Sequence, residues 1–177
     1  MSRARSQTMS DWEVSLRRIL PHYGHRNWIV IADAAYPDQS NPGIETISTG
    51  NDHLEVLKKV LSVLAGQQHV RPVIYTDHEL ARVPEADAPG VNAYRIALSN
   101  LLGKQGNQAL SHDEIISRID KAASLFRVLI LKTNLCIPYT SVFLNLECGY
   151  WTAGAEARLR SSLSAANASP AKSPLKS

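Results

Sequence analysis

The sequence predicts an α/β fold of three layers, α/β/α, in which helices cover both faces of a mostly parallel or mixed central sheet. Two observations carry this prediction. Runs of four or five apolar residues, typical of strands buried on both faces, alternate with segments whose apolar residues recur every three or four positions, as in amphipathic helices. The 177 residues, 44% of them hydrophobic and 20% charged, suit one globular domain with a substantial core.

The first helix is predicted to begin at Ser10, because Glu13 follows three residues later and completes a capping box. Pro21 ends it. Residues 28–32, with the sequence WIVIA, form an unbroken apolar run and are expected to be a strand buried on both faces. A loop rich in proline, asparagine and glycine leads to a weaker strand at residues 44–48.

The second helix is expected to start at Asn51 or Asp52 and to end at Gly66, with an apolar stripe between. The next strand covers residues 70–75. The motif TDHE at residues 76–79 has the spacing of a capping box, and it predicts a short helix that the next proline stops.

The second half of the chain continues the alternation. Residues 91–102 are expected to be helical and to end in a polar turn. A further capping box, SHDE at residues 111–114, opens a helix that runs to about residue 124. Residues 127–131 and 141–146 are the last predicted strands.

Three parts are predicted along the chain: a basic N-terminal extension at residues 1–9, an α/β domain at residues 10–151, and an Ala/Ser-rich tail at residues 152–177. The composition of the tail predicts disorder, with room for a short helix around residues 155–163. The net charge of +3 lies in the two ends, which contribute +2 and +3, whereas the domain carries −2. The basic balance therefore does not indicate a nucleic-acid-binding domain.

No segment predicts membrane insertion or secretion. The longest apolar runs are far too short to span a bilayer, and no apolar stretch follows the basic start. Cys136 and Cys148 have neither a CxxC nor a metal-ligand spacing, so we interpret them as reduced, buried thiols of a cytoplasmic protein. The glycine-rich phosphate motifs GxGxxG and GxxxxGKS/T are absent, which leaves nucleotide binding without support.

Chemistry-bearing residues flank the first predicted strand. Asp33 follows its carboxyl end, where ligands bind in open α/β sheets, although a carboxylate there can equally cap the following turn. His25 lies in the loop before the strand. His22 and His25 have an HxxH spacing, but Pro21 and Gly24 break the helix there and no third ligand is near, so we predict no metal site.

A second polar cluster precedes the last predicted strand. Pro138 fixes the backbone before Tyr139, Thr140 and Ser141, a group that can present a phenol, hydroxyls and backbone groups to a polyhydroxylated ligand. An ordinary strand entry has the same composition, and both interpretations stay open at this point.

Taken together, the two clusters resemble the signature of the ribose pyranase and fucose mutarotase family. The pattern is GH, three residues, hydrophobic-V-hydrophobic-A-D-A, two residues and P, and it occupies residues 24–37. The resemblance covers about residues 10–148 and continues through four further segments: residues 43–48, 54–64, 70–80 and 138–144.

The resemblance implies an enzyme that interconverts ring forms or anomers of a free monosaccharide without cofactor or metal. It also implies ring-shaped homo-oligomers, with a decameric ring as one form, whose sites are built at subunit contacts. His25 matches the catalytic histidine of the family. The residues that match sugar-binding positions are Asp33, His112, Tyr139, Thr140 and Ser141.

Opening a cyclic hemiacetal requires one proton to leave the anomeric hydroxyl and one to reach the ring oxygen, and a histidine can serve either transfer near neutral pH. The leading hypothesis is therefore a sugar mutarotase with His25 as acid/base. Two departures, Ser141 where the family usually has Asn and the altered loop at residues 134–137, motivate an alternative: a non-catalytic sugar-binding or regulatory oligomer. A nucleic-acid-associated protein that uses its basic ends is the third hypothesis.

Overall fold

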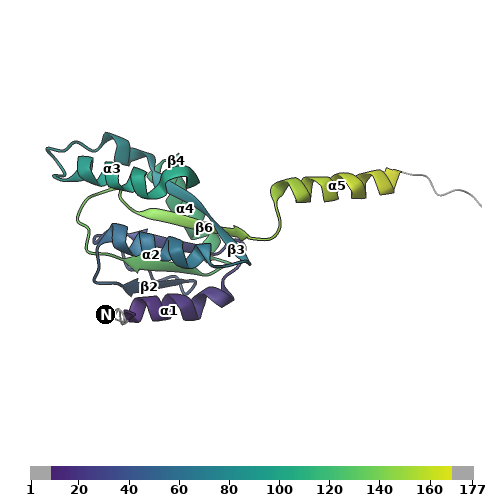
Figure 1. Ribbon diagram of the computed structural model, residues 1–177, viewed down its shortest axis with the longest axis horizontal. Coiled ribbons are helices and arrows are strands. Elements are labelled where there is room, and N and C mark those ends of the chain that lie inside the picture. Colours follow the sequence, from purple (N-terminus) through teal and green to yellow (C-terminus); the bar gives the residue numbers. More distant parts are fainter. Residues whose placement is uncertain (1–8, 169–177) are drawn as a thin grey trace, which may run out of the picture.

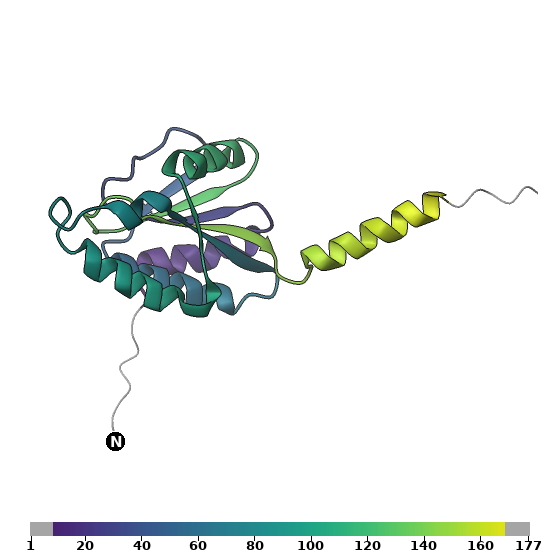
Figure 2. The same ribbon diagram turned by 90° about the horizontal axis from the view of Figure 1, so that it is seen from above.

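The computed structural model describes residues 9–168 and has three layers. A six-stranded mixed sheet forms the middle layer (Figure 1). Helices α1 (Asp11–Ile19), α2 (His53–Ala65) and α3 (Val91–Leu102) cover one face, and α4 (His112–Ala123) covers the other, as Figure 2 shows. The predicted α/β/α class is confirmed.

One antiparallel strand organises the sheet, whose order is β2-β5-β1-β6-β3-β4. β6 runs against both of its neighbours, β1 and β3, whereas every other pair is parallel. The carboxyl ends of β1, β3 and β4 therefore meet the start of β6 at one edge of the sheet. The strands are β1 (Trp28–Ala32), β2 (Ile44–Ser48), β3 (Val70–Asp77), β4 (Gln108–Leu110), β5 (Val128–Lys132) and β6 (Val142–Cys148).

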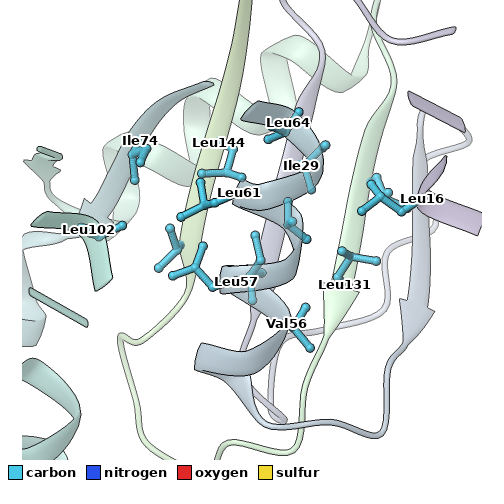
Figure 3. Packing of buried hydrophobic residues seen from close by; sticks show 14 of the residues in the cluster. Leu16, Ile29, Val56, Leu57, Leu61, Leu64, Ile74, Leu102, Leu131 and Leu144 are labelled. Carbon is cyan, nitrogen blue, oxygen red and sulfur yellow. The ribbon is translucent and has the colours of Figure 1, made fainter. Parts of the chain in front are cut away.

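The core lies on both sides of β1, as its unbroken apolar sequence predicts. Ile29 and Ile31 pack into the larger cluster, to which α2 contributes Leu57, Leu61 and Leu64, all labelled in Figure 3. Trp28, Val30 and Ala32 point to the opposite face and pack against α4. All five side chains are buried, so β1 is anchored from both layers.

Two of the predicted helix caps form as expected. The Asp52 side chain accepts hydrogen bonds from two N–H groups in the first turn of α2, at 2.9 and 3.1 Å. Ser111 accepts from the N–H of Glu114 at 3.3 Å. The Ser10 hydroxyl instead donates to the Glu13 carboxylate at 3.0 Å and makes no cap bond to the backbone.

The TDHE motif does not act as a cap, which corrects the prediction. β3 continues through Asp77, and the 3-10 helix η2 (His78–Arg82) begins only afterwards. Pairing decides this, because Thr76 lies opposite Val142 and Asp77 opposite Leu110. The partner strand β4 was not predicted, since three residues are too few to show a period.

Short 3-10 turns follow two of the helices. η1 (Leu20–His22) follows α1, where Pro21 was expected to end the helix, and η3 (Gly103–Gln105) follows α3. Cys136 is exposed and Cys148 is half-buried, so the expected burial of Cys136 is wrong. Neither thiol forms a disulfide.

The tail differs from the expected disorder over residues 153–168, where the structure has the helix α5 (Ala153–Ala168). Figure 1 shows α5 projecting away from the domain. It is longer than the short segment the composition allowed, because alanine favours helix even where little is buried. Residues 1–8 of the basic extension and the end of the tail lie outside the described residues. Within residues 9–168, no helix is both long and apolar enough to cross a membrane.

Gly43, at the entry to β2, supplies a stability test. A Cβ at this position would overlap the backbone carbonyl oxygen of Ala123, the last residue of α4, so we expect Gly43→Ala to lower the free energy of unfolding by about 1–3 kcal/mol. Urea denaturation measures this change. Gly24→Ala is the matched control, because a Cβ there meets nothing within 4 Å and its effect should stay within about 0.5 kcal/mol. Equal stability of the two variants would contradict the close approach.

Candidate functional site

A pocket of about 530 Å³ opens at the edge of the sheet where β1 and β3 end and β6 begins. Asp33 follows β1, Asp77 is the last residue of β3, His112 is the first residue of α4, and Tyr139 precedes β6; all four line the pocket. Segments that are far apart in the sequence thus place carboxylates, an imidazole and a phenol in one space.

Asp33 has both oxygens engaged within the chain. Oδ1 accepts a hydrogen bond from the N–H of Ala35 at 2.9 Å, which is the turn-capping contact that the sequence left open as an alternative. Oδ2 accepts from the Ser141 hydroxyl at 3.1 Å. The carboxylate therefore joins the turn after β1 to the start of β6, and it also lines the pocket.

Of the three residues before β6, Tyr139 lines the pocket, and Thr140 and Ser141 lie behind it. Tyr139 lines the pocket with 39% of its surface exposed, and its backbone has a φ of 58°, in the left-handed region. Thr140 and Ser141 are buried and do not line the pocket. The Thr140 hydroxyl donates to the carbonyl of Ile137 at 2.7 Å, so it fixes the turn. A direct sugar contact by Thr140 or Ser141 stays a prediction.

Asp77 and His112 form a hydrogen-bonded pair within the pocket. Nδ1 of His112 lies 3.2 Å from Oδ1 of Asp77, whose side chain is only 1% exposed. An ionised carboxylate only accepts hydrogen bonds, so Nδ1 carries the proton in this pair. Burial raises the pKa of Asp77 to about 6, against the opposing effect of His112. Asp77 is thus a titratable group near neutral pH.

Sequence reasoning missed Asp77 and Tyr36 as pocket residues. A signal existed for Asp77, because it follows a mostly apolar strand just as Asp33 does. The hydroxyl of Tyr36 is buried, and it faces Gln39 without a hydrogen bond of normal geometry. Burial raises the pKa of Tyr36 to about 12, so it is a neutral hydroxyl at physiological pH. A tyrosine next to a turn carries no sequence signal of its own.

The charge of the pocket restricts its ligand. Three carboxylates, those of Asp33, Asp77 and Asp120, line it, and no lysine or arginine is among its lining residues. Like charges disfavour a phosphorylated or carboxylated ligand. Within residues 9–168, no three His, Cys, Asp or Glu side chains are grouped to hold a metal ion. The lining instead suits a neutral molecule with many hydroxyl groups, which both donate to carboxylates and accept from a phenol.

His25 lies at the opposite end of β1 and does not reach this pocket. The whole of β1 lies between it and Asp33, and the five residues of this strand alone span about 16 Å. His25 is exposed and lines another cavity, of about 590 Å³, together with Arg71, Glu147 and Trp151 at the base of α5. The next residue, Arg26, has a φ of 76°. A single chain therefore brings Asp33, His112 and Tyr139 together but leaves His25 apart.

A buried network supports the pocket from below. Nε2 of His53 lies 3.1 Å from the carbonyl oxygen of Ile31 and must donate to it. The Tyr94 hydroxyl lies 3.2 Å from Nδ1 of His53 and donates to the Thr140 carbonyl at 2.9 Å. Both backbone segments that carry pocket residues are thus tied to the same pair of side chains. Burial lowers the pKa of His53 to about 4, so its ring is neutral at pH 7.

Another cavity of about 530 Å³ lies beside α2 and β3. Its lining, which includes Leu61, Pro72 and Gln108, contains no titratable side chain. This cavity therefore offers no side chain for acid–base chemistry.

Comparisons with known proteins agree with the fold. The chain belongs to the RbsD / FucU transport protein family, which it matches over residues 13–148. The D-ribose pyranase of Pseudomonas putida (strain GB-1) is 30% identical over 139 residues, which are 74% of this chain and 89% of that protein. Helix α5 lies beyond the matched residues.

Two solved structures share the fold. Bacillus subtilis RbsD, in complex with D-ribose, superposes with a TM-score of 0.51 at 22% identity and covers 80% of this chain and 97% of its own. The fucose mutarotase of Streptococcus pneumoniae, in complex with L-fucose, gives a TM-score of 0.50 at 21% identity, covering 75% and 91%. At these identities the likeness establishes the architecture.

The buried His53 predicts a pH dependence of stability. Its folded pKa of about 4 lies below the unfolded value of about 6.5, so the unfolded chain binds the extra proton first and stability falls as the pH drops through this interval. The contribution lost reaches about 3 kcal/mol near pH 4. Urea denaturation of wild type and His53→Gln between pH 4 and 7 measures it. The difference between them should shrink on acidification by this amount; a constant difference would contradict a neutral buried ring.

Proposed function

We propose that the protein is a monosaccharide mutarotase or pyranase. It interconverts the ring forms or anomers of a free, ribose-like or fucose-like sugar by general acid/base chemistry and uses no cofactor. The observation that carries this proposal is the edge pocket itself, in which Asp33, Asp77, His112 and Tyr139 converge with no lysine or arginine among the lining residues. Membership of the RbsD / FucU family supports the same class of substrate.

The pocket supplies the groups that such a substrate needs. Carboxylates accept hydrogen bonds from sugar hydroxyls and orient the ring, and Asp33, directly after β1, lines the pocket where it can do so. The Tyr139 ring, held edge-on against His112 at a centroid distance of 5.7 Å, offers an aromatic face and a phenol. The substrate is neutral because a phosphate would meet three carboxylates with no lysine or arginine to balance them.

His25 acts as an acid/base in this proposal, and its position requires a second subunit. Since His25 and Asp33 lie beyond opposite ends of β1, which spans about 16 Å, and line different pockets, the His25 that serves one pocket must come from a neighbouring copy of the chain. A head-to-tail contact of this kind closes into a ring when the rotation closes. The protein is therefore proposed to work as a homo-oligomeric ring, such as a decamer, with its sites between subunits.

The proposal places the protein in the cytoplasm, with free sugar and other copies of itself as partners and with no role for nucleic acid or membrane. Two unpaired cysteines are compatible with a reducing compartment. The basic ends contribute charge outside the residues that form the pocket.

A second candidate is a sugar-binding or regulatory oligomer that does not catalyse exchange. Two observations favour it: Ser141 stands where the family usually has Asn, and its hydroxyl occupies an oxygen of Asp33 that a sugar would otherwise use. Calorimetry that detects sugar binding, with no accelerated exchange, would select this candidate. Loss of that binding in Asp33→Ala would locate the site in either case.

The proposed catalysis is tested by saturation-transfer NMR on pentoses and hexoses. Wild type should accelerate the exchange of at least one sugar between its ring forms or anomers. His25→Ala should lose at least about 10²-fold of that rate, because a positioned acid/base contributes about 10²–10⁴-fold. His22→Ala, an exposed histidine three residues away, is the control and should keep the rate. No acceleration by wild type with any sugar would refute catalysis.

Sharing of the site is tested by mixing defective subunits. His25→Ala and Asp33→Ala chains, each inactive alone, are co-expressed with different tags and purified together. If each site takes His25 from one chain and its pocket from another, random assembly restores about one quarter of the wild-type sites. Restoration to that level supports the shared site. No restoration, in an assembly that contains both tags, would place His25 and the pocket of one chain in the same site.

A further inference from the structure

Ring opening needs two proton transfers, and the proposed function assigns only one of them. A proton leaves the anomeric hydroxyl while another reaches the ring oxygen, on opposite sides of the bond that breaks. His25 of a neighbouring subunit can serve one transfer. The inference that follows rests on the proposed function and concerns the group within the edge pocket that serves the other.

His112 is held in a defined orientation by three contacts. Its Nδ1 donates to Asp77 at 3.2 Å, its backbone N–H donates to the Glu79 carboxylate at 3.1 Å, and the Tyr139 ring packs edge-on against its imidazole. Nε2 makes no hydrogen bond with the described residues, although the side chain is 39% exposed and lines the pocket. One ring nitrogen is thus fixed and the other is open to a ligand.

The burial of the Asp77 carboxylate costs free energy of folding. A carboxylate that is almost fully buried loses its hydration, and only one of its oxygens is compensated by His112. The second oxygen, Oδ2, has no hydrogen-bond partner among the described residues. A buried acid with one satisfied oxygen contributes little to stability but places a negative charge next to an imidazole.

Three other groups that line the pocket, Asp33, Asp120 and Tyr36, are less suited to the second transfer. Both oxygens of Asp33 already accept hydrogen bonds within the chain. Asp120 is exposed at the rim. The Tyr36 phenol is neutral, and burial raises its pKa to about 12, which makes it a poor base. His112 alone combines an open nitrogen with a fixed partner.

We propose that His112 and Asp77 form an Asp–His pair that carries the second proton transfer: Nε2 of His112 exchanges a proton with the sugar, and Asp77 acts through His112 as a positioning residue. Asp77 fixes the tautomer with the proton on Nδ1, so that Nε2 presents its lone pair to the pocket. Its negative charge also stabilises the imidazolium that forms when Nε2 takes up a proton.

The reaction balances without any other reactant. Nε2 of neutral His112 takes the proton of the anomeric hydroxyl, the bond between the anomeric carbon and the ring oxygen breaks, and a carbonyl forms. The ring oxygen receives a proton from the protonated His25 of the neighbouring subunit and becomes a hydroxyl. Closure reverses these steps on the other face of the carbonyl or through another hydroxyl, and it returns both histidines to their starting states.

The pair imposes a pH dependence on the rate. Asp77 is faced by His112 on α4, Glu79 on η2 and Asp33 after β1, of which His112 favours the ionised carboxylate and the two acids disfavour it. The net effect, dominated by burial, is a pKa of about 6. Below that pH Asp77 takes up a proton and loses its charge, so exchange should slow in the acid limb of the pH profile.

The test compares wild type, His112→Gln, Asp77→Asn and the control Asp113→Asn, an exposed acid next to His112 on the same helix. Sugar exchange is measured by NMR from pH 5 to 8. We expect His112→Gln to lower kcat at least about 10²-fold and Asp77→Asn at least about tenfold, with KM changed by less than about threefold. The acid limb of the pH profile should shift to lower pH in Asp77→Asn, because the negative charge that favours protonation of His112 is gone, and Asp113→Asn should behave as wild type.

A thermal melt separates this role from a structural one. Because the ionised Asp77 is disfavoured by burial, Asp77→Asn should melt no lower than wild type at pH 7 while losing activity. A destabilised Asp77→Asn with an unchanged pH profile, or wild-type rates in either variant, would overturn the inference and leave the proposed function intact. A wild type that accelerates no sugar would overturn the proposed function, and the inference with it.

Discussion

The pairing of β6 with β1 on one side and β3 on the other decides where the pocket lies. Ile31 and Thr76 both lie opposite Val142, so the residues that follow β1 and β3 emerge beside those that precede β6. Were β6 parallel to its neighbours, the tripeptide with Tyr139 would begin at the other edge of the sheet. The single reversed strand therefore assembles acids, imidazole and phenol from four separate segments.

A buried hydrogen-bonded network lies below the pocket, whereas two buried oxygens at the pocket have no hydrogen-bond partner among the described residues. His53 and Tyr94 tie the carbonyl oxygens of Ile31 and Thr140 together in a buried network, which fixes the backbone that carries the pocket. Asp77 and Tyr36 keep unpaired oxygens at the pocket itself. Rigidity and unused hydrogen-bonding capacity thus occupy adjacent layers, as expected of a preorganised binding site.

Local sequence predicts what local forces decide. The apolar run of β1 and the Asp52 cap of α2 follow from residues within a few positions of each other, and both form as predicted. The TDHE motif fails because its outcome depends on strand pairing with residues more than thirty positions away. The helix α5 is longer than the short helix expected at residues 155–163, because the tail was judged by the apolar area it buries, whereas alanine also has a backbone preference for helix.

The candidate site was predictable in part for the same reason. Asp33 and Tyr139 flank strands, and two residues at converging strand ends are expected to be neighbours. Asp77 shows the same pattern but was hidden by its second role as an apparent helix start. The separation of His25 from Asp33 follows from strand length alone, because the two ends of a five-residue strand cannot meet.

If the site is shared as proposed, the two ends of β1 serve two different active sites. One strand, buried on both faces, ends in the carboxylate of its own pocket and begins beside the histidine that serves the next one. Each catalytic unit then exists only while subunits remain associated, so dilution below the dissociation constant of the assembly would abolish turnover without unfolding any chain. Activity would then depend on the contact between copies, because a single domain holds only part of each site.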